Sequence, residues 1–168
     1  MRKTVTALIV TLLPALGMAA QAPLYRMNSA SATDHFYTTN FDEMIQAVNG
    51  TYTYEGISGI CHSTPEGGTT PLYRLWGSKE RDHFYTISWQ ERDLAIAGGS
   101  YVYEGVACYV YTQQQSGTCP FYRLSNGTDH FYTASWQEAT NAVRAYRYQY
   151  EGVAAYILPP QQGGSCPP

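Results

Sequence analysis

The chain has 168 residues, with 10 basic and 13 acidic side chains and a net charge of −3 at pH 7. A phosphate-binding surface needs an excess of lysine and arginine, so this composition argues against nucleic acid as a partner. The length is sufficient for one domain with a real core. The 16 tyrosines stand out, and tyrosine suits both half-buried strands and recognition surfaces.

Residues 1–19 are predicted to be a secretory signal peptide. Arg2 and Lys3 form a basic start, a short apolar run follows, and small residues lead up to Ala19. The apolar run is too short to span a bilayer. We therefore expect a secreted protein, extracellular or periplasmic, whose mature part is a single domain over 20–168.

After this segment the sequence repeats itself, and we divide it into copy 1 (23–70), copy 2 (71–119) and copy 3 (120–166). Each copy begins with Pro-Leu-Tyr-Arg or Pro-Phe-Tyr-Arg, continues to Asp-His-Phe-Tyr-Thr and closes on Tyr-x-Tyr-Glu-Gly. Such internal similarity at a fixed period indicates one supersecondary unit used three times.

Within each copy, two short aromatic segments flank a polar loop and predict a hairpin. A capping box then predicts the start of a short helix: Ser-Trp-Gln-Glu at 88–91 and 135–138, with Asn-Phe-Asp-Glu at 40–43 as a variant. Gly50 and Gly98 are expected to end the first two helices.

Each helix is expected to carry two apolar residues, seven apart, on one face. These pairs are Phe41 with Val48, Trp89 with Ile96, and Trp136 with Val143. A strand follows each helix, as in the segment 101–111.

Each copy therefore reads β-β-α-β, and one copy alone buries too little apolar surface to be stable. We predict an α+β fold in which three tandem β-β-α-β repeats form one compact pseudo-threefold domain. It is mainly antiparallel sheet, with the short helices on the outside or at one end. The sequence leaves open whether the strands close into a barrel or form three separate sheets.

The four cysteines predict two disulfides, because an even count in an exported chain favours pairing. Cys119 and Cys166 occupy the same phase of the repeat, and residues in the same phase are held apart unless they lie near the symmetry axis. We therefore predict that Cys108 pairs with Cys119 and that Cys61 pairs with Cys166.

We consider four kinds of charged residue that recur in every copy, for which two interpretations compete. In the structural one, the arginine meets the aspartate across the hairpin loop, and the glutamate holds the arginine of a neighbouring copy. In the functional one, each copy forms a small polar and aromatic pocket for a sugar, and three weak sites gain by avidity. The predicted ligand-binding residues are Arg26, Asp34, His35, Tyr37, Glu55, Arg74, Asp82, His83, Tyr85, Glu104, Arg123, Asp129, His130, Tyr132 and Glu151.

A metal site and an enzyme are weaker interpretations. The three recurring histidines could hold zinc if they pointed to the axis, but nothing in the strand pattern shows which face is axial, so no metal or cofactor is predicted. The sequence contains no G-x-S-x-G, H-E-x-x-H or glycine-rich phosphate loop. Glycoside hydrolysis needs two carboxylates in different environments, whereas these recur in equivalent ones.

The three motifs resemble a family of exported tandem-repeat domains of unknown function, which occur in bacteria and fungi alone or appended to secreted hydrolases and surface proteins. The resemblance spans 23–158 and implies an extracellular setting and a binding or accessory role, with no catalytic residues to transfer. Copy 1 departs at Asn40, which replaces the capping serine, and at Ile57-Ser58-Gly59.

We therefore predict a secreted, non-enzymatic binding module for a glycan or another extracellular ligand, with up to three equivalent sites. One alternative is a structural or protein-binding accessory domain in which the recurring charges only hold the fold. A hydrolase is the second alternative.

Overall fold

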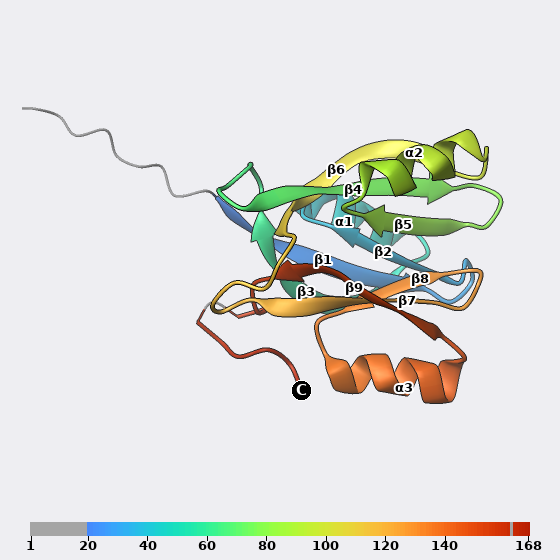
Figure 1. Cartoon of the computed structure of the whole chain (residues 1–168). Helices are drawn as coiled ribbons and strands as arrows, with labels where there is room; N and C mark the ends of the chain where they lie inside the picture. The colour runs from blue at the N-terminus through green and yellow to red at the C-terminus, as the bar shows by residue number, and fades with distance from the viewer. Residues whose placement is uncertain (1–19, 162) are drawn as a thin grey trace, which may run out of the picture.

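The computed structural model describes residues 20–161 and 163–168, so the predicted signal peptide lies outside the described residues. The described part contains nine strands and three helices (Figure 1). In chain order they are β1 (Gln21–Ser29), β2 (Asp34–Thr38), α1 (Phe41–Asn49), β3 (Thr53–His62), β4 (Thr69–Gly77), β5 (Asp82–Thr86), α2 (Trp89–Ala97), β6 (Val102–Tyr111), β7 (Cys119–Ser125), β8 (His130–Thr133), α3 (Trp136–Tyr146) and β9 (Gln149–Ile157). The fold is α+β with mainly antiparallel sheet and short helices, as predicted.

The three predicted hairpins are present as β1–β2, β4–β5 and β7–β8. The long strand after each helix returns to the first strand of its own hairpin, so β3 pairs with β1, β6 with β4 and β9 with β7. Gly56, Gly105 and Gly152 have φ values of 127°, 127° and 122° and lie at register shifts of these pairs. The recurring Glu-Gly motif is thus a β-bulge that requires glycine.

The sheet topology answers the question of barrel or separate sheets. Each copy forms a three-stranded antiparallel sheet. Among the described residues, backbone pairing joins these three sheets at the ends of their long strands, through the pairs His62 with Tyr109 and Tyr111 with Tyr156 and the bridge between Ile60 and Leu158. The ends of the long strands therefore meet, and the second hairpin strands β2, β5 and β8 also contact one another.

The helices begin where the capping boxes predict. The side chains of Asn40, Ser88 and Ser135 accept hydrogen bonds from the backbone N–H three residues later, at 3.0–3.1 Å. Gly50 and Gly98 cap the first two helices, as expected. In Figure 1, α2 and α3 lie on opposite sides of the strands.

The apolar residues at the helix starts are exposed rather than buried. Phe41, Trp89 and Trp136 are 57 %, 56 % and 50 % exposed. The inward contacts come instead from small or flexible side chains, namely Met44 on α1 and the two alanines Ala139 and Ala142 on α3. The aromatic residues are therefore a surface feature of each copy.

The core lies where the three hairpins meet, around three tyrosines. Tyr85 Oη donates to the carbonyl of Tyr37 at 2.7 Å and accepts from its N–H at 2.8 Å. Tyr132 makes the same two bonds to Tyr85, and Tyr37 makes them to Tyr132. This closed ring satisfies the three buried hydroxyls and six backbone groups, the N–H and the carbonyl of each tyrosine. Buried hydroxyls need such partners.

Two disulfides are present, but the predicted pairing is wrong. Cys61 pairs with Cys108 and Cys119 pairs with Cys166, with Cα–Cα distances of 6.2 and 5.4 Å. The pairing of Cys61 with Cys108 follows from the contact between β3 and β6, which pair at His62 and Tyr109, one residue beyond these two cysteines. Cys61, Cys108 and Cys119 all belong to the central core cluster.

Candidate binding site

A clamp of one arginine and two glutamates occurs three times, each between two copies. In the first, Arg26 Nε lies 2.8 Å from Glu55 Oε2, and its terminal nitrogens donate to both carboxylate oxygens of Glu138 at 2.9 and 2.8 Å. The Nε contact is an ion pair rather than an aligned hydrogen bond. The other clamps are Arg74 with Glu104 and Glu43, and Arg123 with Glu151 and Glu91.

These clamps correct the predicted charge pairing. The arginine binds glutamates instead of the aspartate of its hairpin, and the glutamate of the Glu-Gly bulge binds the arginine of its own copy. The partner from the neighbouring copy is a residue missed in the sequence, Glu43, Glu91 or Glu138. Each stands at the third position of its helix, and its recurrence in all three copies was the signal that could have found it.

The charge state of the clamp glutamates follows from these contacts. Burial acts to raise the pKa of Glu43, Glu91 and Glu138, but the hydrogen bonds from the arginine and a threonine, together with the nearby positive charge, outweigh it, so each pKa is lowered. The clamps are therefore ionised at neutral pH.

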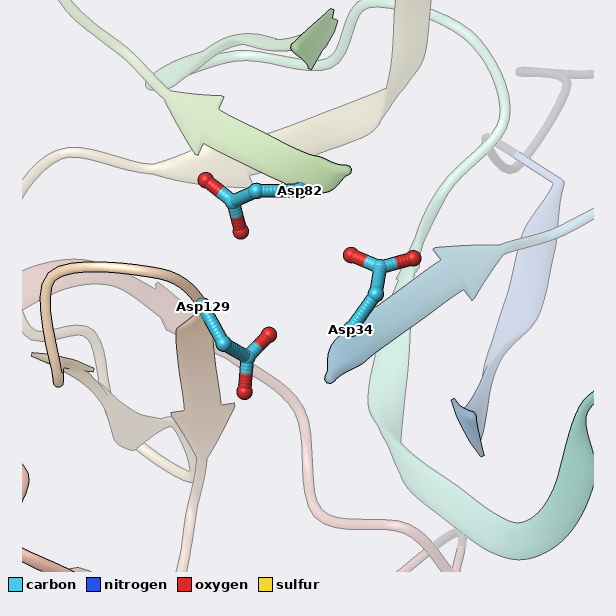
Figure 2. Close-up of side chains that lie close together, drawn as sticks. All are labelled: Asp34, Asp82 and Asp129. Atoms are coloured by element: carbon cyan, nitrogen blue, oxygen red, sulfur yellow. The ribbon is translucent and has the colours of Figure 1, made fainter. Parts of the chain in front are cut away.

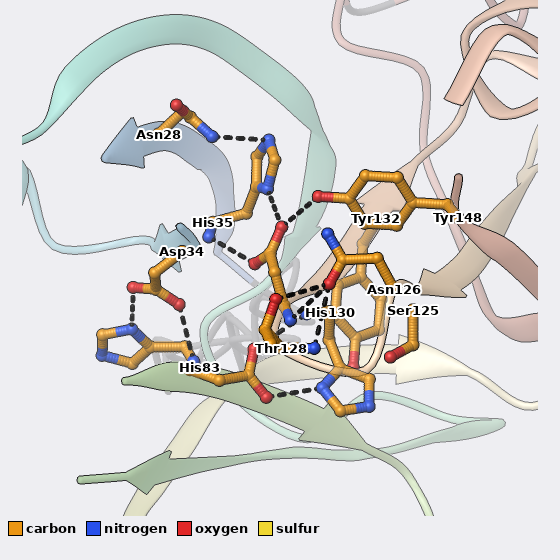
Figure 3. Close-up of polar contacts among 12 residues, drawn as sticks. Asn28, Asp34, His35, His83, Ser125, Asn126, Thr128, His130, Tyr132 and Tyr148 are labelled. Atoms are coloured by element: carbon orange, nitrogen blue, oxygen red, sulfur yellow. Dashed lines mark hydrogen bonds and ion pairs between the residues drawn. The ribbon is translucent and has the colours of Figure 1, made fainter. Parts of the chain in front are cut away.

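A second inter-copy contact joins aspartate, histidine and tyrosine (Figure 3). Asp34 is fully buried and accepts from His83 N–H and His83 Nδ1, both at 2.7 Å, and from Tyr52 Oη at 2.5 Å. The equivalent sets are Asp82 with His130 and Tyr101, and Asp129 with His35 and Tyr148. Burial acts to raise the pKa of Asp82, but the bonds from His130 and Tyr101 outweigh it and the pKa is lowered.

The carboxylates of the three aspartates lie around a common centre in the interior (Figure 2). One oxygen from each of Asp34, Asp82 and Asp129 lies within 4.8 Å of the others. The groups that meet are thus carboxylates, while the histidines bind to them from outside, which reverses the arrangement considered for zinc. Carboxylate oxygens suit a hard cation, but each of these carboxylates already accepts three hydrogen bonds within the protein.

The predicted tyrosines Tyr37, Tyr85 and Tyr132 are 1 %, 1 % and 0 % exposed. Burial raises the pKa of each hydroxyl well above its ordinary value. In this conformation their side chains offer no surface to a ligand, and their hydrogen bonds hold the core.

The predicted arginines and glutamates, by contrast, line three surface clefts, each between a helix start and the long strand of another copy. The α1 cleft, of about 440 Å³, includes Asn40, Glu43, Arg74, Glu104 and Val106. The α2 cleft, of about 220 Å³, includes Ser88, Glu91, Arg123, Glu151 and Val153. The α3 cleft, of about 110 Å³, includes Arg26, Glu55, Ile57, Ser135, Glu138 and Pro167.

A wider groove, of about 810 Å³, lies beside the first clamp, between α3 and the β1–β2 hairpin. We call it the Tyr146 groove; its lining includes Arg26, Asn28, His35, Glu55, Asn141 and Tyr146. It brings together three of the predicted residues of copy 1, and Tyr146 is 70 % exposed at its wall. In copy 1, Asn28 forms a hydrogen bond with His35 Nε2 at 3.0 Å. In copy 2, Trp76 stands opposite the corresponding histidine, His83, with ring centroids 4.6 Å apart.

Exposed aromatic clusters are a further surface feature. Tyr122, Trp136 and Tyr150 form one such cluster, with ring centroids 5.2–6.1 Å apart. Tyr25 contacts Phe41 and Tyr54 in the same way. Sequence reasoning assigned the helix-start aromatics to a packing face and so missed these clusters.

The sequence profile of a family described as a domain of unknown function, DUF5648, matches residues 20–158. The chain belongs to this family. The match covers every helix and strand of the described DUF5648 domain, from β1 to β9, with all three clamps. No curated protein and no solved structure matches the chain. Within the described part of the DUF5648 domain, no helix has the length and apolar character needed to cross a membrane.

Proposed function

We propose that the protein is a secreted, non-enzymatic module that binds a glycan through the Tyr146 groove. In this proposal the chain consists of three tandem units about a pseudo-threefold axis. The support for that arrangement is the recurrence of each contact in cyclic order: the tyrosine ring, the arginine clamps and the aspartate–histidine bonds.

The observation that carries the proposal is the composition of the groove. A sugar is recognised by directional hydrogen bonds to its hydroxyls and by an aromatic face against its ring carbons. The groove offers the amides of Asn28 and Asn141 and the exposed ring of Tyr146. Arg26 and Glu55 are fixed by their clamp, so their remaining polar atoms are held ready for a hydroxyl.

The exposed aromatic clusters support additional weak contacts on the same rigid body. Tyr54, Tyr103 and Tyr150 are 43 %, 40 % and 45 % exposed, one in each copy. Weak sites on one body gain by avidity on a polyvalent surface. The two disulfides support export, because disulfides persist in oxidising compartments.

The pairing of the charged groups favours binding over catalysis. A general acid or base needs an unpaired group whose pKa is matched to proton transfer. The clamp glutamates have lowered pKa values and direct arginine partners. The clamp glutamates and arginines are thus paired ions that hold one another in position, and they are not free to act as a general acid or base.

The alternative of a structural accessory domain is favoured for some predicted residues by a specific observation. Asp34, Asp82 and Asp129 are at most 1 % exposed and bind histidine and tyrosine side chains. We propose that these three hold the copies together, while the groove residues bind the ligand.

The test is a glycan array followed by calorimetric titration of the hits on the protein with its disulfides formed. Tyr146→Ala should weaken glycan binding at least tenfold without changing the melting temperature, because this side chain is mostly exposed. Leu94→Ala, at a site that is 73 % exposed on α2, is the matched control and should bind normally. Absence of any glycan hit would defeat the proposal.

A further inference from the structure

The charges that line the Tyr146 groove do not balance. Glu55 and Glu138 contribute two carboxylates, whereas the described residues of the lining include one arginine, Arg26, and no lysine. Arg26 directs its three nitrogens to these two glutamates, and its guanidinium carbon lies 5.3 Å from the centroid of the Phe131 ring. The clamp therefore leaves one negative charge in the groove without a counterpart.

His35 does not remove this surplus of negative charge. Its Nδ1 lies 2.6 Å from Asp129 Oδ2, and its Nε2 forms the hydrogen bond with Asn28 (Figure 3). A protonated His35 ring is balanced by the buried Asp129 carboxylate, and a neutral ring adds no charge. The other titratable residues of the lining, Tyr146 and Tyr148, are uncharged at neutral pH and in acid.

The two carboxylates of the groove remain accessible although they are paired. The side chains of Glu55 and Glu138 are 31 % and 39 % exposed, against 13 % for that of Arg26. Glu55 makes both of its ionic contacts, to Arg26 and His35, through Oε2, which leaves Oε1 to accept a hydrogen bond. Burial acts to raise the pKa of Glu138, but the bonds from Arg26 and Thr133 and the nearby positive charge lower it, so this carboxylate stays ionised in mild acid.

The exposed aromatic wall of the groove comes from a feature of copy 3. The helix α3 has 11 residues, whereas α1 and α2 have 9 each, and Tyr146 is the last residue of the longer helix. On the other wall, Asn28 stands where copy 2 has Trp76 and copy 3 has Ser125. An ammonium group is attracted both to a carboxylate and to the face of an aromatic ring. The groove therefore favours a cationic sugar over a neutral or an acidic one.

We propose that the ligand of the Tyr146 groove is a glycan with free amino groups, built from units of the glucosamine type. This inference rests on the proposed glycan function and specifies the sugar. The ammonium group of one unit donates to Glu55 Oε1 and to the exposed carboxylate of Glu138, while the sugar ring lies against Tyr146. Asn28 and Asn141 bind the neighbouring hydroxyls. A sugar acid is repelled by the same two carboxylates.

The test compares three tetrasaccharides that share one backbone and differ only at C2, where they carry an ammonium, an acetamido or a hydroxyl group. They are the β-linked tetramers of glucosamine, N-acetylglucosamine and glucose. In calorimetric titration in mild acid, where the amine is protonated, the glucosamine tetramer should bind at one site. Its affinity should exceed that of the other two by about 5- to 30-fold, the range from an exposed ion pair to a hydrogen bond with a charged group. Added salt should reduce this difference, because it screens exposed charges.

A charge can be added to the groove without changing the clamp. Ala145, in the last turn of α3, lines the groove. Ala145→Lys should remove the preference for the glucosamine tetramer, whereas Ala145→Met, of similar length and without charge, should keep it. Ala97→Lys, at an exposed position in the last turn of α2, is the control for net charge and should bind as the wild type does. Both lysines stand near a helix C-terminus, where a cation is favourable, so these variants should fold.

Equal affinity for the glucosamine and glucose tetramers, or tighter binding of the N-acetylglucosamine tetramer, would overturn this inference and leave the glycan function standing. A preference that survives Ala145→Lys would also overturn it, because the amine would then bind outside the groove. If none of the three tetramers binds, the inference is wrong, and the glycan array decides whether the groove takes another sugar.

Discussion

Removal of one hydroxyl from the central tyrosine ring should cost far more stability than its size suggests. In Tyr85→Phe the aromatic ring remains, so no large cavity forms. The change leaves both the N–H and the carbonyl of Tyr37 without their partner, and these bonds measure 2.8 and 2.7 Å in a fully buried environment.

The magnitude follows from the two orphaned groups. An unsatisfied buried donor or acceptor costs about 1–3 kcal/mol, so two of them should lower the free energy of unfolding by about 2–6 kcal/mol. This is a large part of the total stability of a domain, about 5–15 kcal/mol. Because the ring is cyclic, Tyr37→Phe and Tyr132→Phe should each cost a similar amount.

The assay is urea unfolding under non-reducing conditions, followed by circular dichroism. Tyr150→Phe is the control, because Tyr150 is 45 % exposed and its change should cost less than about 0.5 kcal/mol. Equal midpoints for Tyr85→Phe and Tyr150→Phe would refute the reasoning that the hydroxyls close the core. Very different costs for the three core tyrosines would refute the equivalence of the copies.

Other perturbations test the disulfides, the clamps and the charge state. Replacing both Cys61 and Cys108 by serine opens a loop with a sequence separation of 47 and should lower the free energy of unfolding by about 3–4 kcal/mol. Peptide mapping of the unreduced wild type should recover the Cys61–Cys108 pair, and a Cys108–Cys119 peptide would contradict the fold. Arg74→Lys should lower stability by about 1–2 kcal/mol, because lysine cannot bind two carboxylates as the guanidinium fork does; Arg144→Lys, on α3, is the control. The pKa of Glu91 is lowered on folding from its ordinary value of 4.5. The stability that ionised Glu91 contributes to the fold is therefore fully present above that pH and is lost as the pH falls through the lowered pKa. The melting temperature of Glu91→Gln should therefore fall less steeply in acid than that of the wild type.

Local structure was predictable because the signals for it are local. A capping side chain acts within three residues, so Ser88 and Ser135 located the helix starts. The hairpins follow from alternation and turn residues within one short stretch. The recurring glycines Gly56, Gly105 and Gly152 were visible as a motif, although their role as bulges depends on register between strands.

The candidate site was predictable only in part. Arg26 and Glu55 do line a groove, but Tyr37 lies in the core and Asp34 is sealed beneath histidine and tyrosine. A strand pattern shows that alternate residues face opposite sides, and it cannot show which side meets another copy. Burial of the recurring aspartates and tyrosines is a consequence of how the three sheets approach one another.

The sequence by itself determined the order of hairpin, helix and strand and the positions of the helix starts, because these signals act within a few residues. The tertiary structure alone decided the partners of the charges and the pairing of Cys61 with Cys108. These contacts join residues far apart in the chain, and they exist only after the strand ends have converged on a common core. The recurring motifs made each unit recognisable in the sequence, whereas the contacts between units depend on how the three units are arranged in space.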